Sequence, residues 1–157
     1  MSYMKLLKLM YLVDREALLR WGRSMTADNF VSMPRGPVLS QTLNLITEEK
    51  LGESYWKRFI SAPQEYNVSL LEEPEFDELS RADVELIDEL YGKFGGWNRW
   101  DLVRYTHDLP EWTDPKGSSI PIDYRRVLEV GGKSEQEVFE IISDLEEVAL
   151  FEHIVSL

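Results

Sequence analysis

The segment SMTADNFVSMPRGPV, residues 24 to 38, lies between two patterns of helical periodicity and indicates how the chain turns between them. It contains a short extended apolar run, Phe30–Met33, and ends in Gly36-Pro37-Val38. Glycine allows a positive φ, whereas proline fixes its own φ and has no backbone N–H to donate. Because that N–H would be unpaired at the first position of a helix, Pro37 predicts a helix that starts near Val38.

Apolar residues at spacings of three and four predict a helix on the N-terminal side of this segment, over residues 3–21. Gly22 is expected to end that helix, because glycine is the usual residue just past a helix C-terminus. On the other side, the second helix is expected over residues 38–50, with Gly52 just beyond its end.

The rest of the chain is also mainly helical in its pattern. Further helices are predicted over residues 80–94, 99–106, 122–130 and 134–153, with Ser80, Asn98 and Ser134 as N-caps. Alternating residue types predict two short strands, 56–60 and 66–70, although 56–60 fits a helical turn equally well. The predicted fold is mostly α (α+β): one compact domain, residues 1–157, with five to six helices and a small antiparallel β element.

Composition favours a folded, cytoplasmic protein. A chain of 157 residues with 43% hydrophobic residues can bury a core within one domain. It contains no cysteine, which excludes disulfides and zinc–cysteine sites. Charged residues interrupt the N-terminal apolar pattern, so no signal peptide is expected, and no apolar run approaches the roughly 20 residues that a membrane helix needs.

The net charge of −12 disfavours binding to nucleic acid, because lysines and arginines supply most of the affinity for phosphates. Acidic residues are concentrated in residues 72–91, where Arg81 is the one basic residue. Such a surface keeps a protein soluble, and it also complements a basic partner, which mainly raises the association rate and the specificity.

The pattern of polar residues does not predict an enzyme. His107 precedes Asp108, as a general base beside its orienting carboxylate would, but a histidine that bonds the backbone at a helix end has the same sequence. His153 lies near the carbonyl end of the last helix, where a positive charge is favoured. No glutamate stands three residues before a histidine, as di-metal sites in helix bundles require. We expect no catalytic residue, no metal and no cofactor.

Four aromatic residues within 16 positions are the remaining candidates for a binding surface: Trp97, Trp100, Tyr105 and Trp112. Tryptophan and tyrosine are frequent anchors at protein interfaces. The alternative is that these rings cover a small core.

Four pieces of the sequence occur in an order that resembles the Panacea domain, the antitoxin domain that includes SocA-like and phage-associated proteins. They are KLLKLMYLVDRE (5–16), the T-x-D-x-F pattern of Thr26–Phe30, Gly36-Pro37-Val38 and THDLPEW (106–112). Their spacing covers most of the chain, residues 4 to 145.

This resemblance implies a non-enzymatic antitoxin that neutralises a cognate toxin, encoded nearby, by direct binding in the bacterial cytoplasm. The matching segments give the predicted partner-binding residues: Arg35, Gly36, Pro37, His107, Asp108, Glu111 and Trp112. Thr106 is expected to shape the same surface. The sequence leaves the oligomeric state open.

Two alternatives remain at this point. A SocA-like relative acts as an adaptor that delivers its toxin to a AAA+ protease, so the resemblance also allows an adaptor. The residues themselves allow a mobile-element hydrolase that would use His107 with Asp108 or Asp14.

Overall fold

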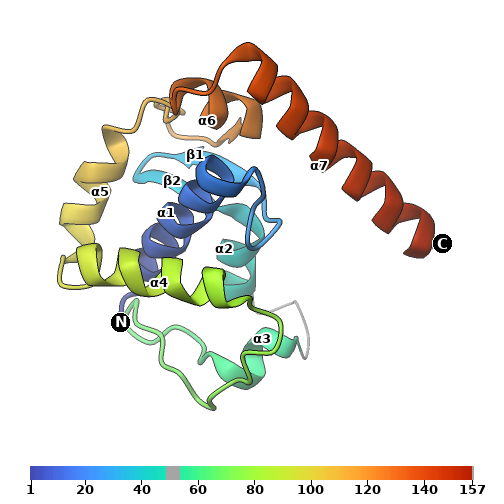
Figure 1. Ribbon diagram of the computed structural model, residues 1–157. Helices are drawn as coiled ribbons and strands as arrows, with labels where there is room; N and C mark the ends of the chain where they lie inside the picture. Colours follow the sequence, from blue (N-terminus) through green and yellow to red (C-terminus); the bar gives the residue numbers. More distant parts are fainter. Residues whose placement is uncertain (49–53, 157) are drawn as a thin grey trace.

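The computed structural model describes residues 1–48 and 54–156 and is organised around one central helix. That helix, α1 (Tyr3–Trp21), begins after Ser2, whose hydroxyl accepts a hydrogen bond from the Lys5 N–H at 3.2 Å. It ends at Gly22, whose φ of 69° is the left-handed conformation expected of a C-terminal glycine. Several of the other helices and the sheet lie around α1 (Figure 1).

A small antiparallel sheet lies against α1 and has the strand order β2-β1-β3. Its strands are β1 (Phe30–Met33), β2 (Gly36–Leu39) and β3 (Ile120–Ile122). The prediction that Pro37 starts a helix is therefore wrong, since Pro37 pairs with Ser32 in a hairpin. Proline is tolerated there because β2 is an edge strand. No further strand on its outer side needs the backbone N–H that proline lacks.

The helices on either side of residues 49–53 also differ from the prediction. Helix α2 (Ser40–Thr47) starts after the strand rather than at Val38, and the predicted end of that helix, with Gly52, lies outside the described residues. The short helix α3 (Tyr55–Phe59) stands where a strand was expected, so the alternative of a helical turn is the one observed. Only isolated bridges, such as Ile60–Leu70, remain of the predicted strand pair.

Helices α4 (Arg81–Phe94) and α5 (Arg99–His107) start at the predicted N-caps. In both, the cap side chain accepts from the backbone N–H three residues on, and the aspartate at that position bonds back to the N–H of the cap residue. The bonded residues are near neighbours in sequence, which is why the pattern alone located both starts.

The C-terminal part consists of α6 (Tyr124–Val130) and α7 (Glu135–Ser156). Ser134, a predicted N-cap, forms reciprocal hydrogen bonds with Glu137 at the start of α7. Figure 1 shows α7 leaving the body of the molecule, so that its C-terminal half points away from the other elements. The described residues thus form seven helices, more than the five to six predicted, and the predicted mostly helical α+β class is confirmed.

The buried side chains form three clusters, and α1 contributes to each of them. One face of α1 packs Tyr11 and Leu18 against the sheet and α6. Leu9 and Leu12 meet α4 and α5, and Leu7 meets Val38 and Ile46. Fully burying one such apolar side chain contributes about 1.5–3 kcal/mol. Helix α1 is therefore the common core element on which the other segments are positioned.

Candidate functional site

The hairpin turn between β1 and β2 approaches α1 and α5 closely at Gly36. Its φ is 98°, and a Cβ built there would lie 2.7 Å from the Thr106 Oγ1 atom and 2.9 Å from the Lys8 Nζ atom. Both the backbone conformation and the available space therefore require glycine. The Gly-Pro pair of the sequence is a point of contact between a hairpin and two helices.

Lys8 lies beneath this turn and is 1% exposed. Its Nζ donates a hydrogen bond of 2.8 Å to the Pro37 carbonyl oxygen. Burial lowers the pKa of the Lys8 ammonium from its usual 10.5 to about 7, because desolvation disfavours the charged form. This lysine was not among the predicted site residues; it sits on the buried stripe of a helix, where a lysine is unusual.

Two aromatic side chains hold the carbonyl groups of the same turn. The Nε2 atom of His107 lies 3.0 Å from the Pro34 oxygen, and Trp112 Nε1 donates to the Met33 oxygen at 2.9 Å. The two rings are stacked, with centroids 4.2 Å apart and an interplanar angle of 28°. His107 and Trp112 therefore fix the hairpin turn to the end of α5.

Glu111 joins this region to the centre of α1. It is 3% exposed, accepts a hydrogen bond from the Tyr11 hydroxyl at 2.8 Å, and pairs with the guanidinium of Arg15 through both carboxylate oxygens. Burial, together with the Glu111 carboxylate, raises the pKa of Tyr11 well above its usual value, so this phenol remains a donor. The Glu111 side chain is thus occupied within the fold.

The structure brings all seven predicted site residues to the turn and the end of α5, but they do not share one role. Arg35 and Asp108 are exposed, and His107 and Trp112 are half-buried. The other three, Gly36, Pro37 and Glu111, are buried and support the surface from beneath.

Trp100 adds an exposed ring beside Arg35 that the predicted set of site residues left out. The remaining rings of the predicted aromatic group, Trp97 and Tyr105, pack against Phe94. The aromatic group therefore divides between core and surface.

The aspartates of the matching segments hold loops. Asp14 is fully buried and accepts bonds from the Ser24 hydroxyl at 2.8 Å, from the backbone N–H groups of Met25 and Thr26, and from the Thr26 hydroxyl. Asp28 accepts from two N–H groups at the start of α2 and from the Thr42 hydroxyl. Asp14 therefore holds the 24–26 loop against α1, and Asp28 ties the segment before β1 to the start of α2.

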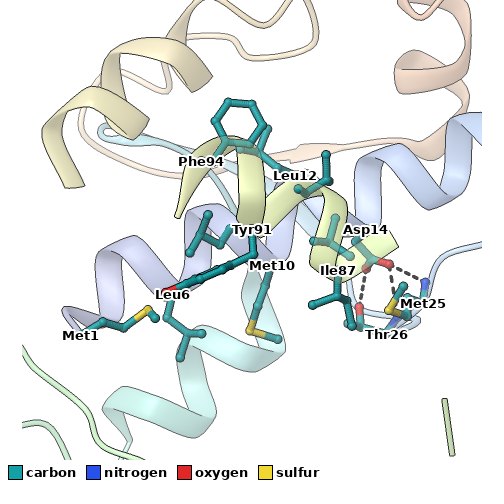
Figure 2. A pocket seen from close by; sticks show the side chains of 13 residues that line it. Met1, Leu6, Met10, Leu12, Asp14, Met25, Thr26, Ile87, Tyr91 and Phe94 are labelled. Carbon is teal, nitrogen blue, oxygen red and sulfur yellow. Dashed lines mark hydrogen bonds between the residues drawn. The ribbon is translucent and has the colours of Figure 1, made fainter. Parts of the chain in front are cut away.

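Figure 2 shows Asp14 and Thr26 at one end of an apolar pocket between α1 and α4. The pocket has a volume of about 220 Å³ and is lined by methionine and leucine side chains together with Ile87, Tyr91 and Phe94. Its wall exposes almost no polar atoms, so the pocket suits an apolar group and offers no polar groups for a reaction.

The hydrolase alternative gains no geometric support. The Asp14 carboxylate is bonded to the 24–26 loop, and His107 is engaged with the hairpin turn. Residues 1–48 and 54–156 contain no group of three or more acidic or histidine side chains that would hold a metal ion. Among these same residues, none of the helices combines the length and apolar character that crossing a bilayer requires.

The amino-acid sequence matches a model of a known protein family. The family model described as "Antitoxin SocA-like, Panacea domain" matches residues 6–113. These residues include most of α1, the hairpin, α5 and the loop that ends at Trp112, so the match contains the whole candidate site.

The match covers more than half of the chain, and the protein belongs to this family. The family supports an antitoxin role in the broad sense. No curated protein and no solved structure matches the chain.

Proposed function

We propose that this protein is a cytoplasmic antitoxin that binds a cognate toxin, encoded nearby, and neutralises it by direct contact through the hairpin-turn surface. We define that surface as the exposed or half-buried residues Arg35, His107, Asp108 and Trp112. The supporting observation is that separate segments of the family match converge on it, tied by bonds from His107 and Trp112 to the turn. A surface held this rigidly loses little entropy on binding.

Stoichiometric inhibition suits this geometry better than catalysis. The side chains of the surface are bonded to backbone carbonyl groups or exposed, and none is arranged as a nucleophile beside a base. Tryptophan and arginine are enriched among the residues that dominate the energy of protein interfaces, and this surface contains one of each, Trp112 and Arg35.

Growth rescue tests the proposal. The neighbouring reading frame is expressed alone and then together with this protein, and we expect toxicity that co-expression relieves. Replacing Trp112→Ala should weaken rescue without unfolding the protein, because the ring is half-buried at the surface rather than part of the core. Trp112→Phe keeps an aromatic ring there and should retain more of the rescue.

Trp21→Ala is the matched control, because Trp21 is an exposed tryptophan about 20 Å along α1 from Lys8. It should rescue growth like the wild type. Thermal unfolding of each variant separates loss of binding from loss of fold. Normal rescue by Trp112→Ala would remove this surface from the interface, and a toxic neighbour that the wild type does not neutralise would refute the function.

The adaptor alternative predicts a different readout in the same cells. An adaptor for a AAA+ protease shortens the half-life of the toxin, whereas an inhibitor that acts by binding leaves it unchanged or lengthens it. Following the toxin after synthesis is stopped, with and without this protein, distinguishes the two.

A further inference from the structure

Trp100, in the first turn of α5, is 44% exposed and has two guanidinium groups over its ring. The Cζ of Arg99 lies 5.2 Å from the ring centroid, and the Cζ of Arg35, from the hairpin turn, lies 5.5 Å from it. The tight turn at Gly36 is what brings Arg35 to α5. Two cations from distant parts of the sequence therefore meet at one exposed aromatic ring.

Neither of these arginines has a carboxylate partner among the described residues. Six other arginines there form ion pairs: Arg15, Arg20, Arg23, Arg58, Arg81 and Arg104. In a chain with 29 acidic and 17 basic residues, carboxylates are abundant, yet these two guanidiniums at one ring are left without one. Their donors remain available to an acceptor from outside the chain.

The surface beside the two arginines is hollowed. A pocket of about 230 Å³ is lined by Tyr3, Met4, Arg35, Tyr66, Arg99 and Trp100. A hydrogen bond of 2.9 Å from the Tyr3 N–H to the Tyr66 oxygen fixes the two tyrosines that form one wall. The volume exceeds the roughly 150 Å³ of a cavity that accommodates a benzene ring. Within the part of the chain that the structure describes, the pocket thus combines apolar walls with two cationic donors and no acidic side chain.

We propose that this arginine–tryptophan pocket, defined by those six residues, binds a short acidic segment of the protein partner, with a carboxylate on the guanidiniums and an adjacent apolar side chain in the hollow. The planar fork of arginine matches a carboxylate in bidentate geometry. The proposal rests on the proposed function, since Arg35 belongs to the hairpin-turn surface, and it adds the chemistry of the partner. A nucleic acid is a poorer occupant, because its affinity depends on neutralising several phosphates along a continuous polyanion. The pocket supplies two guanidiniums, which are enough for one carboxylate, in a protein whose net charge is −12.

The first test uses a probe of defined chemistry. The protein labelled with ¹⁵N is titrated with the capped peptide Glu-Glu-Phe-Glu, and the indole N–H signals of its five tryptophans are followed. The Trp100 signal, assigned with Trp100→Phe, should move while that of Trp21 does not. Lys-Lys-Phe-Lys and a short single-stranded oligonucleotide serve as comparison ligands and should have smaller effects.

The paired variant Arg35→Glu with Arg99→Glu should weaken peptide binding about tenfold or more. Its matched control is Arg125→Glu with Arg126→Glu, two exposed arginines of α6 with the same total change in charge. Equal weakening in both variants would reduce the effect to net charge and overturn the proposal. A stronger response to the oligonucleotide, or no shift of the Trp100 signal at all, would also overturn it.

Growth rescue with the same two variants separates this inference from the proposed function. If the wild type rescues and the variant at positions 35 and 99 rescues equally well, the pocket does not bind the toxin, although the antitoxin function stands. If the wild type fails to rescue, the antitoxin function is wrong, and the peptide titration still decides what the pocket binds.

Discussion

The first and last helices of this protein are of similar length and have opposite environments. Helix α1 buries eight residues, including the charged Lys8 and Asp14. Helix α7 buries only Val138 among its described residues, although its C-terminal half is rich in large apolar side chains. Leu150 and Phe151 are 60% and 67% exposed. The hydrophobic content of a helix therefore does not determine whether that helix is buried. Burial depends on which other elements pack against it.

The difference has a physical origin. Helix α1 is contacted by the sheet, by α4, by α5 and by α6, so even its polar groups find partners inside the fold. Helix α7 meets the body mainly through α6 and then leaves it (Figure 1). Its exposed half carries apolar side chains on a strongly acidic helix that has no lysine or arginine.

The largest expected effect is at Asp14. The Asp14→Ala change should lower the free energy of unfolding by about 3–5 kcal/mol, because it leaves several buried donors of the 24–26 loop without an acceptor. Asp144→Ala on α7 is the control and should change it by less than about 0.5 kcal/mol, since that side chain is exposed. Urea unfolding measures both, and similar values would contradict the comparison.

A leucine pair tests the same contrast without charge. Leu18→Ala in α1 removes a fully buried side chain and should cost about 2–5 kcal/mol. Leu150→Ala in α7 should cost less than about 0.5 kcal/mol, because that side chain is already in water. If Leu150→Ala proved as costly as Leu18→Ala, α7 would have to be covered in solution.

Two glycines separate backbone strain from crowding. Gly36 and Gly132 have similar positive φ values of 98° and 92°, but only Gly36 has atoms within 4 Å of the position that a Cβ would occupy. Both alanine variants should be destabilised by about 1–3 kcal/mol through φ, with a further loss at Gly36 from contact with Thr106. Thermal unfolding of the pair gives the difference, and equal losses would mean that Lys8 and Thr106 shift freely.

The smallest expected effect is the change in the free energy of unfolding per pH unit that Lys8 introduces. Its pKa is about 7 in the folded protein and near 10.5 when unfolded. Between these values the unfolded chain binds more protons, so stability should rise with pH, by up to about 1.4 kcal/mol per pH unit. Urea unfolding from about pH 7 to about pH 9.5, inside that window, measures this slope.

Lys8→Met should flatten that slope, because the buried group can no longer gain a proton on unfolding. Lys133→Met, just before α7, is the control and should leave the slope as in the wild type, since no buried ammonium is removed. A wild-type stability that does not rise over this range would show that Lys8 stays protonated in the fold.

Prediction from sequence succeeded where the determinants are local. Ser80 and Asn98 located the starts of α4 and α5, and Gly22 located the end of α1, because capping bonds join residues that are near neighbours in the chain. It failed at Pro37, whose conformation suits a helix start and an edge strand equally. Pairing with Ser32 decided between them, and that contact belongs to the hairpin rather than to the residues next to Pro37.

The candidate site shows the same division between what local sequence indicates and what distant contacts decide. The sequence identified its segments, and it marked Arg35, His107 and Trp112 as members of one surface. It did not reveal that Glu111 is buried against Tyr11 and Arg15, because carboxylates in sequence look alike whether they face water or a guanidinium.

By itself, the sequence determined the class of fold and the starts of most helices, because these depend on periodicity and on short-range caps. The family followed from the order of the matching segments rather than from periodicity. The tertiary structure alone decided that Lys8 lies under Gly36 and that Arg35 and Arg99 meet at Trp100. It also decided that α1 is enclosed while α7 is exposed. These outcomes depend on contacts between residues far apart in the chain, which neither spacing nor composition encodes.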